Sequence, residues 1–241
     1  MIIVDMSNLA ISAIQSATSG DRGSLILNEQ VIRHIILKSL IELHKKIGRH
    51  HELVLAFDSK NYWRKDYFKW YKGNRKKKDD KFSWDEFYRL YNDFKKELPL
   101  YFGYKCIEVD RVEGDDIIYV ISEYHQGVNI VIASSDTDDL QIQEKWPVAC
   151  QYSLKTRKYI TPKDYNYTLE DHIIEGDAAD GVPNCLSDGD CYVVEGKKTT
   201  VLTKGRRAKI KFIMPEENRE RYEQNKKIID MSQIPIEYKL I

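Results

Sequence analysis

Three short, almost entirely apolar segments, each followed within a few residues by an aspartate, constrain the fold of this chain more than any other feature. The segments are residues 2–4, 53–57 and 130–133, and the aspartates are Asp5, Asp58 and Asp136. Short runs of this kind are typical of parallel strands buried on both faces of a sheet. Open α/β sheets bind ligands at the carboxyl ends of their strands. A doubly wound arrangement therefore places the three carboxylates at one edge of one sheet.

Residues 112–138 form the densest acidic unit. Glu113, Asp115 and Asp116 stand at the start of an apolar run with helical spacing, where acids suit the helix dipole. The third apolar segment follows, and Asp136 and Asp138 come directly after it. We predict a helix, a buried strand and an acidic turn in that order.

Two further acids, Asp177 and Asp180, lie in a polar turn after a helix-like segment at residues 169–175. Two like charges about 4 Å apart cost roughly 4 kcal/mol at an effective dielectric near 20. A converging cluster therefore requires cations or protonation. The candidate metal ligands are Asp5, Asp58, Glu113, Asp115, Asp136, Asp138, Asp177 and Asp180.

Oxygen ligands favour Mg²⁺ or Mn²⁺ over zinc, and no His/Cys set with zinc spacing is present. Two such ions can bind a phosphodiester, activate a water and stabilise the leaving oxygen. Two other aspartate motifs do not fit the residues around Asp5. Ser7 stands where a haloacid-dehalogenase-type phosphatase needs a second aspartate, and Leu9 breaks an integrin-type metal motif. A helix N-cap after a strand remains an open alternative for Asp5.

The formal net charge of zero conceals strongly basic segments. Residues 64–81 carry nine basic residues against three acids, and residues 197–211 carry seven and no acid. Aromatic residues interleave with the cations of residues 62–78, a pattern that suits phosphates and stacked bases. The alternative is a solvated helix whose rings pack on the protein. The patches favour a polyanion met at defined places.

Other features indicate an ordinary folded chain. The 42% apolar share supports a core. Amphipathic or charged helices are expected at residues 28–47, 84–94 and 218–230, and a hairpin at 148–160. The four cysteines form no Cys-x-x-Cys pair and are expected as reduced thiols of a cytoplasmic protein. No apolar run approaches membrane-spanning length, and no signal peptide is expected.

Taken in order, these motifs resemble the 5′-nuclease (flap endonuclease-like) superfamily. The resemblance covers about residues 2–236, and each motif is weak alone but specific in this order. The motifs that carry it are strand-Asp5, strand-Asp58, Tyr71-Lys72-Gly73-Asn74-Arg75, Glu113-Gly114-Asp115-Asp116, Ser134-Ser135-Asp136-Thr137-Asp138 and Gly176-Asp177-x-x-Asp180.

The resemblance implies an α/β protein with a PIN-like core, a central mostly parallel sheet and a helical arch over the active site. It implies a nuclease core at residues 1–170, with the arch at about 60–98, and a divergent, helix-hairpin-helix-like duplex-binding region at 171–241. It implies a 5′→3′ exonuclease and flap endonuclease acting on RNA·DNA hybrids and duplex DNA, and removing RNA primers during phage DNA replication.

The resemblance also implies roles for individual residues. Asp5, Asp58, Asp115 and Asp136 would hold the first of two Mg²⁺ ions, for which Mn²⁺ can substitute. Asp138, Asp177 and Asp180, with Glu113, would serve the second. Beside the scissile phosphate it places Tyr71, Lys72, Arg75 and Arg64, with Asp116 in support. Expected contacts with nucleic acid come from Lys65, Lys69, Lys197, Lys198, Arg206 and Arg207.

The sequence departs from the family after Asp180. Gly181 replaces an asparagine, Asn184 follows Pro183, and only Glu195-Gly196-Lys197-Lys198-Thr199 remains of the helix-hairpin-helix motif. This puts the duplex grip and its monovalent-ion site in doubt. A C-terminal segment used for partner docking is also expected to be absent.

Two other functions remain open: a PIN-type endoribonuclease, which would be shorter and lack the arch, and a catalytically silent nucleic-acid-binding module, which would tolerate loss of acids. Expected partners are RNA·DNA hybrid, duplex and flap DNA, and replication proteins such as a single-strand binding protein or a clamp. We expect a monomer with no membrane partner, in the host cytoplasm if the chain is phage-encoded.

Overall fold

The computed structural model describes residues 1–18, 29–75 and 84–239. The chain forms two compact units. Unit 1 comprises Met1–Lys60 and Asp79–Thr161, and unit 2 comprises Asn61–Lys78 and Pro162–Ile241. Each unit has its own architecture and is described separately.

Unit 1 is built on a six-stranded sheet in the order β3-β2-β1-β4-β5-β6. Its strands are β1 (Ile2–Asp5), β2 (Leu53–Phe57), β3 (Lys105–Glu108), β4 (Ile130–Ala133), β5 (Ala149–Ser153) and β6 (Lys158–Ile160). All neighbouring pairs are parallel except β5–β6, the expected hairpin. The three predicted apolar strands are adjacent, with β1 between β2 and β4. The predicted α/β fold with a mostly parallel sheet is confirmed.

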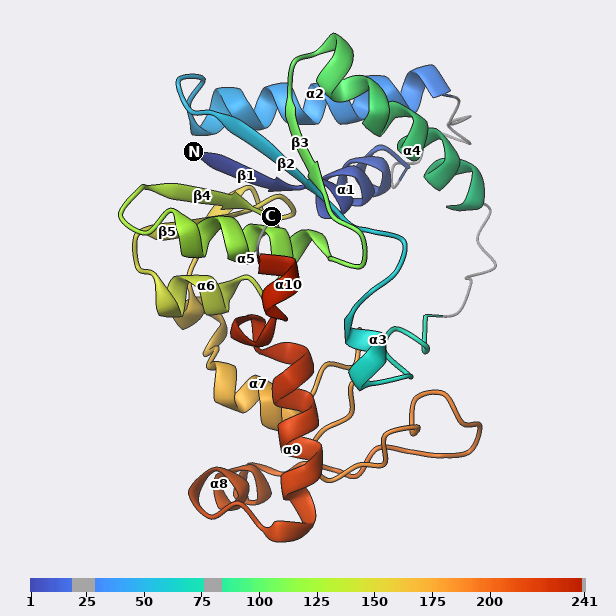
Figure 1. The fold of residues 1–241 in the computed structure, drawn as a ribbon, viewed down its shortest axis with the longest axis vertical. Coiled ribbons are helices and arrows are strands. Elements are labelled where there is room, and N and C mark those ends of the chain that lie inside the picture. The colour runs from blue at the N-terminus through green and yellow to red at the C-terminus, as the bar shows by residue number, and fades with distance from the viewer. Residues whose placement is uncertain (19–28, 76–83, 240–241) are drawn as a thin grey trace. The chain divides into compact units, whose positions relative to one another are not determined.

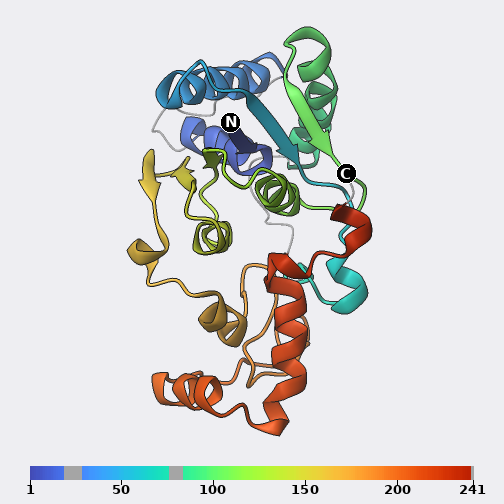
Figure 2. The same cartoon turned by 60° about the vertical axis from the view of Figure 1, so that its left-hand side comes forward.

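Helices cover both faces of this sheet (Figures 1 and 2). They are α1 (Met6–Thr18), α2 (Glu29–Ile47), α4 (Trp84–Tyr101), α5 (Gly114–Tyr124) and α6 (Leu140–Lys145). Alternate strand residues such as Ile2, Val4 and Leu55 join the core formed with α1, α2 and α4. Successive strand residues point to opposite faces. The intervening strand residues therefore face the side on which α5 packs against β1, β2 and β3.

Unit 2 is mainly helical. It contains α3 (Arg64–Tyr67), η1 (Pro162–Tyr165), α7 (Leu169–Glu175), α8 (Lys204–Phe212), α9 (Glu216–Ile229), η2 (Met231–Gln233) and α10 (Ile236–Lys239). One small core joins Phe68 and Tyr71 to Ile173 of α7 and Ile228 of α9. Asn225 fixes α9 to α7 and to the turn that follows it by donating to the carbonyls of Ile173 and Pro183, at 3.0 and 2.7 Å.

The predicted domain boundaries and the arch at residues 60–98 stay predictions, since residues 76–83 lie outside the described residues. Those residues include the basic positions 76–78 and 81 of the first patch. All four cysteines are free thiols. In the described part of the chain, no helix has the length and apolar character needed to cross a membrane.

Candidate active-site residues

Asp5 ends β1 and begins α1. Its Oδ1 accepts a hydrogen bond from the backbone N–H of Asn8 at 2.9 Å, which is the N-cap interaction that sequence analysis left open. Its Oδ2 accepts from the Ser134 hydroxyl after β4 at 3.4 Å. Asp5 therefore caps a helix and also faces the acidic turn of a neighbouring strand, so the two interpretations hold together.

Asp58 follows β2 and meets the start of α5. Its Oδ1 accepts from the backbone N–H of Gly114 at 2.7 Å. A side chain at Gly114 would bring a Cβ within 3.3 Å of the same oxygen and 3.9 Å of an Asp5 oxygen. Glycine at this position therefore lets the helix start lie close against two carboxylates. The sequence motif contained this residue, but only the geometry gives its reason.

Glu113 and Asp116 cap α5. The Glu113 side chain accepts from the backbone N–H of Asp116, and the Asp116 side chain accepts from the backbone N–H of Glu113. This reciprocal arrangement is called a capping box. Both side chains are buried. This gives Asp116 a structural role in capping α5, while the supporting role that the resemblance implies stays a prediction. It gives Glu113 a structural role beside its predicted role toward a metal, which stays a prediction.

The turn after β4 holds Asp136 and Asp138 in place. The Ser134 hydroxyl accepts from the Asp136 N–H at 3.1 Å, and Asp136 Oδ1 accepts from the Asp138 N–H at 3.0 Å. The fully buried Gln151 of β5 donates to the carbonyls of Ser134 and Asp136. Hydrogen bonds within the turn and from β5 therefore hold the backbone that carries Asp136 and Asp138.

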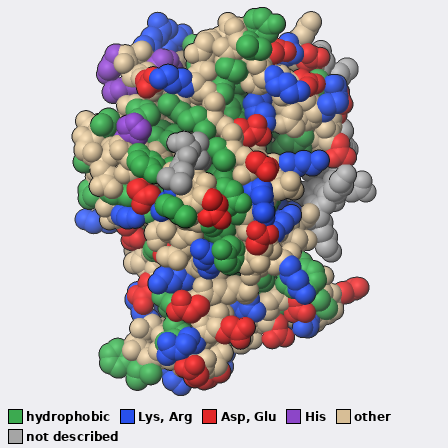
Figure 3. All heavy atoms as spheres, viewed as in Figure 1, with side chains coloured by type: hydrophobic (Ala, Val, Ile, Leu, Met, Phe, Trp, Pro, Cys, Tyr) green, Lys and Arg blue, Asp and Glu red, His purple; other side chains and the backbone are tan. Residues whose placement is uncertain are grey.

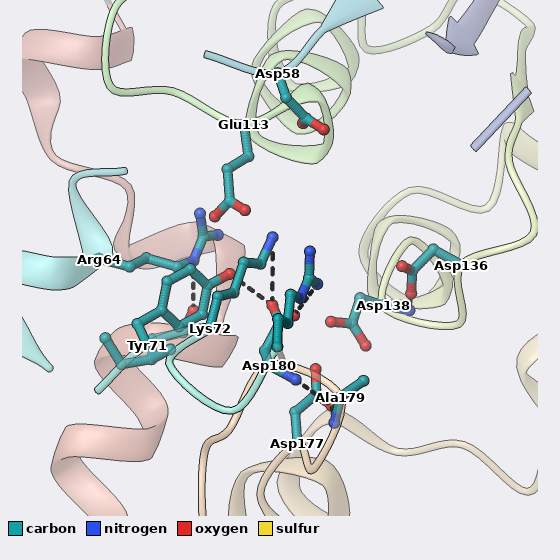
Figure 4. Close-up of polar contacts among 12 residues, drawn as sticks. Asp58, Arg64, Tyr71, Lys72, Glu113, Asp136, Asp138, Asp177, Ala179 and Asp180 are labelled. Carbon is teal, nitrogen blue, oxygen red and sulfur yellow. Dashed lines mark hydrogen bonds and ion pairs between the residues drawn. The ribbon is translucent and has the colours of Figure 1, made fainter. Parts of the chain in front are cut away.

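The strand ends that carry Asp5, Asp58 and Asp136 lie at the point where the order of the sheet reverses. The chain proceeds from β1 to β2 and β3 on one side, and then to β4 and β5 on the other. Ligands bind at such switch points of open α/β sheets. Figure 4 shows Asp58 and Asp136 beside the elements that carry them.

The electrostatics of unit 1 indicate that several of these carboxylates interact. Burial first, and then the charge of Asp58, raise the pKa of Asp5 to about 7. Burial also raises the pKa of Asp115 well above its usual range, with contributions from the carboxylates of Asp139, Asp5, Asp136 and Asp58. Such shifts mark carboxylates that repel one another in a site of low polarity. An oxygen-only set of this kind fits hard divalent cations.

Asp139 belongs to this cluster, and the sequence patterns did not single it out. It is fully buried, and of the neighbouring carboxylates it raises the pKa of Asp115 most. Only its position one residue beyond Asp138 could have suggested it.

In unit 2, three side chains of one segment converge on Asp180 (Figure 4). The Tyr71 hydroxyl donates to Asp180 Oδ2 at 2.6 Å, and Lys72 Nζ lies 3.7 Å from the same oxygen. Arg75 pairs with Oδ1. The predicted Asp180 and three of the residues predicted to lie beside the phosphate thus form one network.

Backbone contacts fasten the same segment. The Lys72 N–H donates to the Asp180 carbonyl at 2.7 Å, and the Asn74 side chain donates to the Ala178 carbonyl at 2.7 Å. Lys72 has a φ of 57°, in the left-handed region that non-glycine residues rarely adopt. Residues held in such conformations cluster at functional sites.

Arg64 and Asp177 occupy different environments in this unit. Arg64 is buried, its Nε donates to the Ile228 carbonyl at 2.8 Å, and its guanidinium lies over the rings of Trp63 and Tyr71. Asp177 Oδ1 accepts from the N–H groups of Ala179 and Asp180 at 2.8 and 3.3 Å. Burial and the charge of Asp180 raise its pKa.

The predicted nucleic-acid contacts are of two kinds. Lys65 and Lys69 are exposed and lie over the rings of Tyr62 and Trp70, while Trp63, Phe68 and Tyr71 are buried and serve the core. Lys198 and Arg206 are also exposed.

The other two predicted contact residues, Lys197 and Arg207, already form ion pairs with acidic neighbours. Lys197 lies 2.7 Å from Asp190 and 3.5 Å from Asp188, and Arg207 pairs with Glu175 and Asp171. On the face shown in Figure 3, basic and acidic side chains are interspersed. Lys197 and Arg207 would have to exchange these partners to contact phosphates.

Fold and site together define a PIN-like α/β protein with a carboxylate cluster at the switch point of its sheet. The sequence model of the family described as 5′-3′ exonuclease, N-terminal resolvase-like domain matches residues 2–169. The chain therefore belongs to this family, as the motif order predicted. It is a member of the 5′-nuclease superfamily.

Similar proteins come from bacteriophages. Ribonuclease H of Enterobacteria phage T4 is 28% identical over 254 aligned residues, which cover 97% of this chain and 81% of that protein. Among solved structures, the T5 D15 protein co-crystallised with metal ions superposes with a TM-score of 0.68 at 16% identity, covering 95% and 89% of the two chains.

A second solved structure is the phage T5 D15 flap endonuclease in a pseudo-enzyme-product complex with DNA and metal ions. It has a TM-score of 0.66 at 15% identity and covers 95% of this chain and 88% of that one. At such identities these two structures establish the shared fold.

Proposed function

We propose that this protein is a divalent-metal-dependent 5′→3′ exonuclease and flap endonuclease. It hydrolyses phosphodiesters of RNA·DNA hybrids and duplex DNA, and it removes RNA primers during phage DNA replication. The observation that carries the proposal is the carboxylate cluster at the β1–β4 switch point in a member of the 5′-3′ exonuclease family. The names of the phage T4 and T5 relatives support the substrate classes.

The acids of unit 1 suit a hard cation. Their oxygens are the ligands that Mg²⁺ and Mn²⁺ prefer, and their mutual repulsion falls when a cation binds. We assign Asp5, Asp58, Asp115 and Asp136 to the first ion. From the resemblance alone, we assign Asp138, Asp177 and Asp180, with Glu113, to the second. Two such ions supply an activated water and stabilise the leaving oxygen.

The segment containing Tyr71, Lys72 and Arg75 would bind and orient the scissile phosphate. Lys72 and Arg75 supply positive charge, and Asp180 holds both in place. Arg64 supports Tyr71 through its contact with the ring. Lys65, Lys69, Lys198 and Arg206 would contact phosphates along the strand and position it without reading sequence.

A cleavage assay tests the proposal. With Mg²⁺, purified protein should shorten a 5′-labelled RNA·DNA hybrid to small products, and EDTA should stop the reaction. Duplex DNA and a 5′-flap substrate run in parallel give the balance of the exonuclease and flap activities. A parallel reaction with Mn²⁺ in place of Mg²⁺ tests whether Mn²⁺ can substitute.

The assay also separates this proposal from the other functions. Binding without cleavage across Mg²⁺ and Mn²⁺ concentrations would overturn it in favour of a silent binding module. Preference for single-stranded RNA loops would overturn it in favour of a PIN-type endoribonuclease.

A further inference from the structure

Asp139 is the one carboxylate among the described residues of unit 1 whose two buried oxygens both lack a hydrogen-bond partner. It lies at the start of α6, directly after the acidic turn, and it is 0% exposed. Among the described residues, neither of its side-chain oxygens has a hydrogen-bond partner. Leaving a buried polar group unpaired costs roughly 1–3 kcal/mol, and more when the group is charged. A side chain in this state needs a partner that the part of the chain described by the structure does not provide.

The nearby Ser134 hydroxyl does not supply that partner. Burial raises the pKa of Asp139 most and the Ser134 hydroxyl lowers it, but this hydroxyl makes no hydrogen bond of ordinary geometry to that carboxylate. Its single proton is directed to Asp5 Oδ2, and its oxygen accepts from the Asp136 N–H. The hydroxyl is therefore already engaged on both sides.

The unpaired oxygens belong to the carboxylate cluster. Asp139 interacts electrostatically with Asp136 and Asp5, and it affects Asp115 more than any other carboxylate does. Asp139 is thus within electrostatic range of three of the four carboxylates assigned to the first ion. The atoms that lack partners are acceptors only when ionised, so the partner that fits them is a cation.

We propose that Asp139 is a direct ligand of the ion that Asp5, Asp58, Asp115 and Asp136 hold. This extends the metal set beyond the eight carboxylates that the sequence motifs contain, and it rests on the proposed function. A carboxylate that binds the ion directly adds charge and an oxygen to the site, so its removal weakens binding of the ion itself.

Metal binding and thermal unfolding of two variants test the assignment. Asp139→Asn keeps the shape of the side chain, and Asp139→Ala removes every ligand atom. We expect both to bind Mn²⁺ on the order of tenfold more weakly than the unaltered protein in calorimetric titrations. In EDTA both should melt at or above the temperature of the unaltered protein, because a buried unpaired carboxylate is gone. The rise in melting temperature with Mn²⁺ should shrink.

Two controls make the result specific. Asp136→Asn should lose Mn²⁺ binding at the site of the first ion. Asp230→Asn alters another buried aspartate, whose oxygen accepts from the Ser232 N–H, and it should bind Mn²⁺ normally. If Asp139→Ala binds Mn²⁺ within twofold of the unaltered protein while Asp136→Asn does not, Asp139 is not a ligand and the metal centre stands. If the unaltered protein neither binds Mn²⁺ nor cleaves, the proposed function itself fails.

Discussion

At the scale of the residue, Asp5 couples folding to pH. Its pKa is about 7 in the folded protein and near 3.8 when the chain is unfolded. Between these values the folded state binds more protons than the unfolded state, so the stability of the metal-free protein falls as pH rises through this range. One group with such a difference changes stability by up to about 4 kcal/mol, since each pKa unit is worth ~1.4 kcal/mol.

Melting temperatures in EDTA between pH 4 and pH 8 measure this fall. Asp5→Asn should flatten the profile, because the substituted side chain does not titrate. Mg²⁺ should raise the melting temperature more at pH 8 than at pH 5, where protons compete with the ion. A metal-free protein whose stability rises steadily over this range would contradict the shared burial of these acids.

Two substitutions at this scale separate metal binding from phosphate binding. Asp136→Asn should abolish cleavage and leave binding of a DNA duplex nearly unchanged. Lys72→Ala should slow single-turnover cleavage by about 100-fold, the effect typical of losing one group that stabilises transition-state charge. Its Mn²⁺ affinity should stay normal. Lys38→Ala, on the exposed side of α2, is the matched control. Equal activity in all three would refute the assigned roles.

At the scale of the element, Asn225 couples α9 to α7. The side chain is fully buried and donates to two carbonyls that flank the turn carrying Asp177 and Asp180. Asn225→Ala leaves both carbonyls without that donor, and each such loss costs roughly 1–3 kcal/mol. We expect unit 2 to unfold at a lower urea concentration, with a free energy of unfolding that is smaller by about 2–4 kcal/mol in total. Glu223→Ala, exposed on the same helix, should change stability little.

Elements that bury at least one whole face could be predicted from the sequence. Elements that are mostly exposed were missed. Strands β2 and β4 are apolar throughout, and β1 is apolar up to its last residue, Asp5, because helices cover both of their faces. Strand β3 was missed because it is an edge strand with exposed Lys105 and Glu108. Helix α8 was missed because Ile210 is its one buried residue.

The candidate site divides in the same way. Motif order found the carboxylates at strand ends, because backbone geometry brings those ends together. Asp139 escaped because nothing local distinguishes a buried acid from an exposed one. The pairing of Lys197 with Asp190, and of Arg207 with Glu175, also depends on tertiary contacts between segments that no local pattern connects.

At the scale of the whole molecule, 38 basic and 38 acidic residues leave no net charge to attract nucleic acid from a distance. Binding should therefore depend on a few local phosphate contacts, each of which releases counterions. The logarithm of the duplex affinity should fall linearly with the logarithm of the salt concentration, by about 0.9 per phosphate neutralised. Fluorescence anisotropy with a labelled duplex in EDTA, which prevents cleavage, measures this slope.

Substitutions then show which cations contribute. Lys198→Ala and Arg206→Ala remove exposed side chains and should each reduce the slope by about 1. Lys197→Ala should reduce the slope less, because Lys197 forms ion pairs with Asp188 and Asp190 and binds phosphate only after these pairs break. An equal loss for Lys197 would mean that the ion pairs open at no cost when the duplex binds. A slope near zero in the unaltered protein would exclude an electrostatic grip on the duplex altogether.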